Sequence, residues 1–389
     1  MESFVGALRN AKGGRPRTSP IQLVTPSQVR ARLQVVKAIT MDDQGITSQF
    51  FSRTRNFLFR GRPIIYILIL LGGCASSYLY KVRAHNIFSC QATGYTSDTY
   101  LAYCDANSYG DYDHGAFWFD LEPAAERSAA TADVLFLGNS RMQFAFSTTA
   151  TAQWLASAKY YLLGFLGFEN SIFARALLHK LKPKAKVYVI AIDDFFEASE
   201  RPLAKIVMHG GEGRSRYEVK RLLQIIHKAI CRKLTRICGD GVVVFRSLQT
   251  GTFNMTQTSK FRGLARQVSY DQQIDENAVN EAITIGRVFL SDLPVKPECI
   301  ILTASPTVDT KLRVANAIAS GLGKTLVVPE QMDGLRTIEG VHLDRPSAER
   351  WSEVFFRSAS PEIQKCLEDH RVASSPNPTH DTANSAELE

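Results

Sequence analysis

The residues best suited to chemistry are a serine and a histidine that lie far apart in the sequence. Ser140 stands within Gly-Asn-Ser-Arg directly after an apolar run, and His342 has Glu339 three positions before it. A serine hydroxyl becomes nucleophilic at neutral pH when an imidazole takes its proton and a carboxylate orients that imidazole. The two segments therefore predict a catalytic triad of Ser140, His342 and Glu339.

The elements around these residues agree with that prediction. The apolar residues 134–137 are typical of a buried strand, and the small residues after them would hold Ser140 at the strand's carboxyl end, where α/β sheets carry their chemistry. Asp344 is an alternative orienter of the histidine. Because Pro346 follows it at the spacing of a helix start, we expect Asp344 to cap a helix instead. Taken alone, Ser140 could be a structural serine in a tight turn, but the joint occurrence of both segments favours catalysis.

The same residues resemble a known family. Residues 138–141 resemble the nucleophile block of the SGNH (GDSL-like) hydrolases, and Glu339-x-x-His342 resembles their final Asp-x-x-His block with Glu in place of Asp. The resemblance covers roughly residues 130–358. It is strongest to the membrane-anchored branch that is associated with acyl groups on bacterial surface polysaccharides.

The oxyanion hole is where the chain departs from the family pattern. The resemblance implies hydrogen-bond donors at the backbone amides of Ser140 and of Gly164 or Gly167, and a third donor from an Asn after the next strand. Asp193 and Asp194 stand at that third position, and a carboxylate donates a hydrogen bond only when it is protonated. This leaves open an altered oxyanion hole or a site that only binds glycan. No further ligand follows the two aspartates at a suitable spacing, so we expect no metal site.

Short apolar runs alternate with helical patterns from residue 133 onward. The alternation predicts a doubly wound, flavodoxin-like α/β fold, with a parallel sheet and helices on both of its faces. We expect this domain over residues 129–360, with an insertion at 199–290 and a disordered tail over 368–389. The expected strands are residues 134–137, 186–192, 300–303 and 325–328, and the expected helices include residues 149–158, 170–181 and 311–320.

The positive charge of the chain is concentrated before one apolar segment. Residues 1–62 hold eleven Lys or Arg and three acids, while the rest of the chain is balanced. Residues 64–80 carry no charge and have basic residues on both sides. This pattern predicts a flexible cytoplasmic lead over residues 1–62 and a single transmembrane helix over 63–81 in a bacterial inner membrane, with the remaining domain in the periplasm. Because the basic excess does not line a folded face, we expect no nucleic-acid partner.

Three alternatives remain open for this region. Leu-Gly-Gly-Cys74 has the form of a bacterial lipoprotein cleavage site, which would leave a lipidated cysteine. Met41 could be the true start of the protein, which would shorten the lead. The apolar segment could also be a buried core helix, although its flanking arginines argue against that interpretation.

Residues 84–128 are a polar connector with an aromatic and acidic run. These aromatic side chains could form a rim that stacks on sugar rings or a lid strand that packs onto the core. Cys90 and Cys104 in this connector are a plausible disulfide in an oxidising compartment. We expect Cys231 and Cys238 to be too far apart to bridge if one helix continues through both, and Cys299 to be a core residue.

The helical pattern over residues 217–237 is strongly basic. It could meet phosphate or an anionic lipid surface, or it could be the solvated face of the insertion, and amphipathicity alone does not separate these interpretations.

The function that follows is a membrane-anchored, SGNH-like serine esterase or O-acyltransferase. It would act on acyl (acetyl) groups of an envelope or exported polysaccharide through an acyl-serine intermediate. No cofactor is implied because the triad is self-sufficient, and the expected partners are the membrane, an acylated glycan and polysaccharide-biosynthesis membrane proteins. The alternative is a non-catalytic SGNH-like envelope protein that binds glycan or scaffolds a synthesis or export complex. Hydrolysis and transfer share the same acyl-enzyme, so the sequence does not separate them.

Overall fold

The computed structural model describes residues 63–84, 87–105, 109–211, 213–234, 238–239, 241–256, 264–270 and 273–374. The predicted lead over residues 1–62, the alternative start at Met41 and the tail beyond residue 374 lie outside the described residues. The chain divides into two compact units, residues 1–82 and 83–389, and each unit is described by itself.

The first unit shows a helix, α4 (Pro63–Ala84), over the segment predicted to cross a membrane. The apolar side chains of residues 67–71 are each more than half exposed. Cys74 lies in the same helix, is exposed and forms no disulfide. Within the described parts of the chain, no helix meets the combined length and hydropathy of a membrane span. The transmembrane helix and the lipidated Cys74 therefore stay predictions.

The second unit is built on a parallel sheet, as the sequence predicted, although its strand at residues 160–165 was not among the expected strands. Its strands are β3 (Val134–Asn139), β4 (Tyr160–Phe165), β5 (Val187–Ala191) and β9 (Ile300–Thr303), in the order β4-β3-β5-β9. In chain order this is second, first, third and fourth, which is the start of the flavodoxin-like arrangement. The predicted strand at 325–328 is reduced to a single parallel bridge between Leu302 and Leu326. All residues of β3 and β5 are buried, as expected for a sheet covered on both faces.

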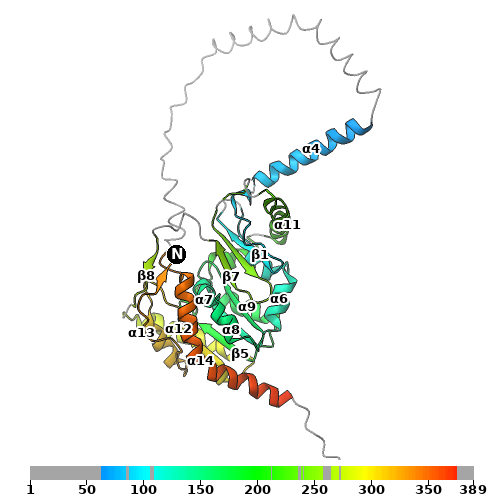
Figure 1. Cartoon of the computed structure of the whole chain (residues 1–389). Coiled ribbons are helices and arrows are strands. Elements are labelled where there is room, and N and C mark those ends of the chain that lie inside the picture. The colour runs from blue at the N-terminus through cyan, green and yellow to red at the C-terminus, as the bar shows by residue number, and fades with distance from the viewer. Residues whose placement is uncertain are drawn as a thin grey trace, which may run out of the picture. The chain divides into compact units, whose positions relative to one another are not determined.

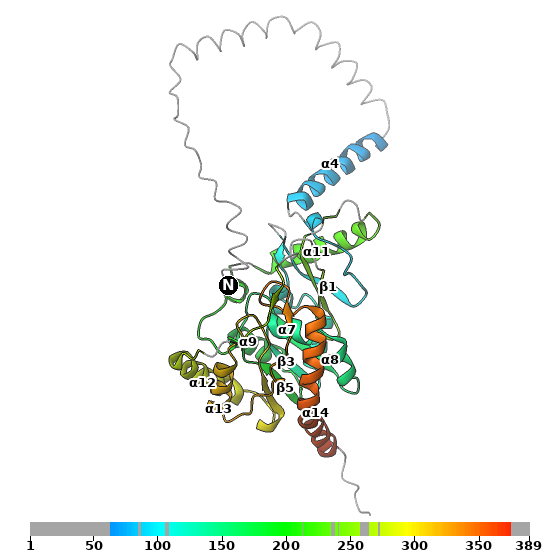
Figure 2. The same ribbon diagram turned by 60° about the vertical axis from the view of Figure 1, so that its left-hand side comes forward.

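Helices pack around this sheet (Figures 1 and 2). One group comprises α7 (Ser140–Phe146), α8 (Thr149–Trp154) and α14 (Arg345–Ser374), and α14 packs on both of the others. A second group, α6 (Pro123–Ala130) and α9 (Ser171–Leu181), contacts β4 and β3 respectively. Further along the chain, α12 (Glu276–Ser291) and α13 (Leu312–Gly321) pack on each other.

Two boundaries differ from the sequence prediction. The predicted insertion at 199–290 includes most of α12, which instead belongs to the α/β layers because it packs on α13. The predicted disordered tail over 368–389 overlaps α14, which continues to Ser374. Cys366 and Leu367 are buried in the same hydrophobic cluster as Trp351 and Phe356, which explains why the chain stays helical there.

A second, antiparallel sheet joins the connector to the insertion. Its order is β2-β1-β6-β7, from β1 (Thr99–Cys104), β2 (Gly110–Asp111), β6 (Val243–Ser247) and β7 (Phe253–Thr256). The same regions contribute η2 (Ile87–Ser89), α5 (Asp113–Trp118), α10 (Pro202–Met208) and α11 (Arg214–Cys231). Tyr109, Tyr112 and Phe117 are buried, so the aromatic run packs onto the core and does not form an open rim of sugar-stacking rings. Near the other end, β8 (Arg266–Gln267) pairs with β10 (Arg336–Thr337), and η5 (Pro297–Cys299) precedes β9.

Three disulfides cross-link the second unit. The predicted Cys90–Cys104 bond is present, with a Cα–Cα distance of 6.0 Å. The expectation for Cys231 and Cys238 was wrong: they are bonded because α11 ends at Cys231, so the helix does not continue between them. Cys299 is buried as expected, yet it also forms a disulfide with Cys366 and thereby ties the start of β9 to α14.

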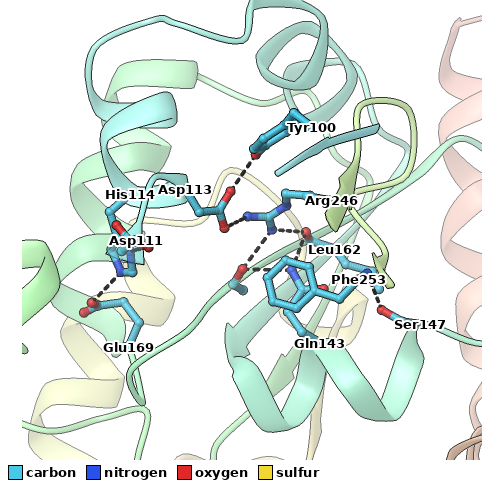
Figure 3. Close-up of polar contacts among 11 residues, drawn as sticks. Tyr100, Asp111, Asp113, His114, Gln143, Ser147, Leu162, Glu169, Arg246 and Phe253 are labelled. Atoms are coloured by element: carbon cyan, nitrogen blue, oxygen red, sulfur yellow. Dashed lines mark hydrogen bonds and ion pairs between the residues drawn. The ribbon is translucent and has the colours of Figure 1, made fainter. Parts of the chain in front are cut away.

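Fully buried charged side chains hold the second sheet to the first (Figure 3). The Arg246 guanidinium on β6 donates to Asp113 Oδ2 over 2.5 Å and to the Leu162 carbonyl oxygen over 2.7 Å. Gln143 on α7 donates to the same carbonyl oxygen over 2.9 Å. Tyr100 also donates to Asp113 over 2.5 Å, so both oxygens of the buried Asp113 carboxylate have a donor, whereas the Arg246 Nε has no hydrogen-bond partner among the described residues.

A buried imidazolium completes this polar layer (Figure 3). The ring nitrogens of His114 lie 3.0 Å from Asp111 Oδ1 and 3.0 Å from Glu169 Oε2. Burial disfavours the charged ring, but the two carboxylates outweigh that effect and raise the pKa of His114 to about 10. His114 is therefore charged at neutral pH and joins the connector to the residues after β4, a structural role.

We expect His114→Asn to lower the melting temperature because it leaves two buried carboxylates without their cation, a loss of about 3–5 kcal/mol. The raised pKa means that the stabilisation is complete below the unfolded-state pKa near 6.5 and is lost as the pH rises through about 10. Thermal unfolding between about pH 6 and pH 10 should show this loss in the parent protein and not in the variant. His209→Asn, at a half-exposed histidine paired with Glu200, is the matched control. Equal destabilisation by His114→Asn at both ends of the range would contradict the assignment.

Candidate active site

The turn that carries Ser140 is fixed by Asn139, the last residue of β3. The Asn139 side chain accepts a hydrogen bond from the Arg141 amide over 2.9 Å and so caps α7, which begins at Ser140. Its Nδ2 donates to the Asp193 carbonyl oxygen over 2.8 Å, which ties the ends of β3 and β5 together. At Gly138 a Cβ would lie 2.9 Å from the Cβ of Met142, so glycine is what allows α7 to turn back closely over the strand.

The loop that carries His342 is a tight hairpin. Thr337 and Leu343 bridge as antiparallel partners, and the Ile338 amide donates to the His342 carbonyl oxygen over 2.7 Å. Gly340 takes a φ of +99° at the tip, a conformation that favours glycine. This turn explains why a carboxylate three positions before the histidine folds back onto the imidazole ring.

The structure brings the three predicted triad residues together. His342 Nε2 lies 2.8 Å from Ser140 Oγ, and His342 Nδ1 is hydrogen-bonded to Glu339 Oε1. The Phe144 ring packs on the imidazole with a centroid distance of 4.4 Å. Both Ser140 and His342 are buried, at 2% and 9% exposure, so the pair is shielded from bulk water.

The geometry separates the two candidate orienters of His342. Asp344 Oδ1 accepts from the Ser347 amide over 2.9 Å and caps α14, as expected from the sequence. The second oxygen of Glu339 is buried and has no hydrogen-bond partner in the described part of the chain. The Glu339 carboxylate therefore interacts with the imidazole of His342.

The two predicted oxyanion-hole glycines lie in different places. Gly164 is inside β4 opposite Gly138, and its carbonyl oxygen accepts from Gln143 and Arg246, each over 2.8 Å. A Cβ there would lie 2.9 Å from the Asn139 carbonyl oxygen, so Gly164 allows β4 to pack under the nucleophile turn. Gly167 follows the end of β4, at the same sheet edge as Ser140, with a φ of +80°.

Asp193 and Asp194, at the expected position of the third oxyanion-hole donor, have different partners. Asp193 Oδ2 accepts from the Ser305 amide over 2.5 Å, which joins the ends of β5 and β9. Burial raises the pKa of Asp193 to about 7, although the charge of Arg141 and the Ser305 hydrogen bond act in the opposite direction. Asp194 has a φ of +53° and pairs with Arg141 over 3.1 Å.

No metal site involves these aspartates in the residues that the structure describes. Among the described residues, the group of three side chains whose ligand atoms lie close enough to hold a metal ion is His227, Cys231 and Cys238. The two cysteines are bonded to each other, and both nitrogens of His227 have partners, at the Tyr95 hydroxyl (3.1 Å) and the Cys90 carbonyl oxygen (3.0 Å). The donor set is therefore not available for a metal ion.

A cavity of about 630 Å³ lies beside the nucleophile turn and was not predicted from the sequence. Arg141, Asp193 and Asp194 line it on one side, and residues from α12 and α13 line it on the other. Its further charged lining residues are Glu197, Asp275, Glu281, Asp309 and Lys311. The position of Arg141 at the cavity could have been expected from the sequence, since it follows Ser140 directly. The contribution of α12 to the cavity lining depends on how distant elements pack, which no local sequence pattern shows.

The ionisation of Asp193 should appear in the pH dependence of the ester cleavage that the sequence predicts. Because its pKa is raised to about 7, the carboxyl is neutral below that pH and negative above it. A negative charge at this sheet edge would oppose the charge that develops on a substrate oxygen at Ser140. We expect the ratio of kcat/KM in Asp193→Asn to that of the parent to rise several-fold between about pH 6 and pH 8. Parallel pH–rate profiles for the two proteins would contradict this prediction.

Comparison of the chain with protein-family models, with curated proteins and with solved structures finds no match. The functional conclusion therefore depends on the geometry of this site. Its strongest element is the hydrogen-bonded series from Ser140 through His342 to Glu339.

Proposed function

We propose that the chain is a membrane-anchored, SGNH-like serine esterase or O-acyltransferase that acts on acyl groups of an envelope or exported polysaccharide. The observation that carries this proposal is the contact of 2.8 Å between Ser140 Oγ and His342 Nε2, with Glu339 bonded to the other ring nitrogen. A hydroxyl, an imidazole and a carboxylate in this series form the arrangement of serine acyl-transfer enzymes.

In the proposed reaction, Ser140 Oγ attacks the ester carbonyl carbon while His342 Nε2 takes the hydroxyl proton. Glu339 accepts from Nδ1–H, which keeps Nε2 unprotonated before the attack and stabilises the imidazolium afterwards. The imidazolium then protonates the leaving alcohol, and an acyl-Ser140 remains. Water or a sugar hydroxyl next gives its proton to His342 and takes the acyl group, which restores the serine.

The backbone amides of Ser140 and Gly167 are the proposed oxyanion donors. Both residues lie at the carboxyl edge of the parallel sheet. Gly164 is the weaker candidate, because it is inside β4 and packs beneath the nucleophile turn. In its neutral form Asp193 is the proposed third donor, in place of the amide side chain that the family resemblance implies.

The neighbouring cavity suits a hydroxyl-rich group. Its aspartate and glutamate side chains provide hydrogen-bond acceptors for sugar hydroxyls, and Arg141, the residue after Ser140, provides a donor. We assign it to the glycan of the acylated substrate or acceptor.

The proposed location is the outer side of a bacterial inner membrane. The basic lead before the apolar α4 supports an amino terminus in the cytoplasm under the positive-inside rule. The three disulfides support an oxidising compartment for the second unit.

A non-catalytic, glycan-binding envelope protein is the second candidate function. The observation that favours it is Asp193, because its carboxylate form cannot donate to an oxyanion. The two candidates differ in one measurable respect: the binding protein would fold and bind glycan without turning over an ester.

Steady-state hydrolysis of an aryl acetate by the detergent-solubilised full chain tests the proposal. We expect Ser140→Ala and His342→Ala to lower kcat by about 10³-fold or more, and Glu339→Gln by about 10²–10⁴-fold, because each breaks the same proton path. Asp344→Asn is the control, since Asn keeps the cap of α14 and the residue does not touch the imidazole.

Two results would count against the proposal. Absence of turnover in a folded parent protein would favour the binding protein. Loss of activity in Asp344→Asn but not in Glu339→Gln would reject Glu339 as the orienter.

A further inference from the structure

The exposed side of α11 carries a strip of apolar side chains. The helix packs Tyr217, Leu223 and Cys231 into the second unit, where they are buried. On the opposite side Val219, Leu222 and Ile225 are 43%, 49% and 61% exposed. Residues three positions apart share one face of a helix, so these three side chains form a continuous strip. Leu234, beyond the end of the helix, is 57% exposed.

Basic residues accompany this strip. The exposed or partly exposed ones are Arg214, Arg216, Arg221, Lys228, Arg232 and Lys233. Glu218 is the one acid between residues 214 and 234. A fully solvated helix face would carry polar side chains alone, whereas the exposed side of α11 combines the apolar strip with these basic residues, of which Arg214 pairs with Glu218 and Arg221 lies 3.9 Å from Glu122. This is the composition of helices that lie in a membrane interface.

The fold holds α11 next to the start of the second unit. α11 packs against η2, and His227 lies 3.0 Å from the Cys90 carbonyl oxygen. The Cys231–Cys238 disulfide closes the segment after the helix, in which Arg232, Lys233 and Leu234 lie.

We infer that the α11 face, defined as Val219, Leu222 and Ile225 with the basic residues beside them, lies in the interface of an anionic lipid bilayer. This inference rests on the proposed membrane anchoring of the chain. The apolar side chains enter the boundary of the acyl chains, and the cations stay among the anionic headgroups.

A second copy of the chain fits this face less well. A two-fold contact would bring the same basic residues of both copies together across the interface, where like charges repel. An anionic bilayer offers the opposite charge together with an apolar layer.

A fluorescent probe of depth tests the inference in the full chain. The environment-sensitive dye NBD is attached at Leu222→Cys in a Cys74→Ser background, which removes the free cysteine of α4. The protein is reconstituted into vesicles of phosphatidylcholine, with or without phosphatidylglycerol, that carry a doxyl-labelled lipid quencher. The matched control is Val288→Cys on α12, whose parent side chain is 48% exposed.

We expect quenching at position 222 to be several-fold greater than at position 288, with a blue-shifted emission that strengthens when phosphatidylglycerol is present. Val219→Ser with Ile225→Ser should reduce this quenching. Equal weak quenching at 222 and 288 overturns the inference, and equal strong quenching at 222 without phosphatidylglycerol overturns the requirement for anionic lipid. A blue shift that depends on protein concentration in detergent assigns the face to a second copy instead.

The inference and the proposed function fail separately. Extraction of the vesicles with alkaline carbonate reports on the anchoring by α4, and hydrolysis of an aryl acetate by the same labelled samples reports on Ser140. The probe at position 222 reports on α11 alone, so a catalytically inactive protein with a quenched probe would leave this inference standing.

Discussion

The candidate site depends on one hydrogen bond, between the hydroxyl of Ser140 and the imidazole of His342. The two residues belong to opposite ends of the α/β domain in sequence, and α14, which begins shortly after His342, packs on α7, which begins at Ser140. β3 lies inside the parallel sheet between β4 and β5, so Ser140 emerges at a carboxyl edge that has loops on both sides. The hairpin at Gly340 then turns Glu339 and His342 back toward that edge.

The antiparallel sheet is joined to the parallel sheet through the side chain of Arg246. Arg246 donates to the carbonyl oxygens of Leu162 and Gly164 in β4, and Gln143 of α7 donates to the same two oxygens. The connector and the insertion are therefore part of the structure that positions α7. The buried charges of the connector and the insertion are paired, and the aromatic side chains around them are buried.

The sequence predicted the triad, the parallel sheet and the cap at Asp344, because each depends on local patterns: an apolar run, a small-residue turn, or a carboxylate at a fixed spacing. It did not predict the cavity, the Cys299–Cys366 bond or the burial of Arg246. These features depend on which distant elements pack together, as when α14 carries Cys366 back to the start of β9. The Cys231–Cys238 expectation was wrong because the end of α11 was placed too late.

The most direct test of the central claim is intact-protein and peptide mass spectrometry after rapid quenching of the full chain with an aryl acetate. The account predicts one added acetyl group on the parent protein, located on Ser140, and no such adduct in His342→Ala. An acetyl group on another residue, or one that forms equally well without His342, would contradict it.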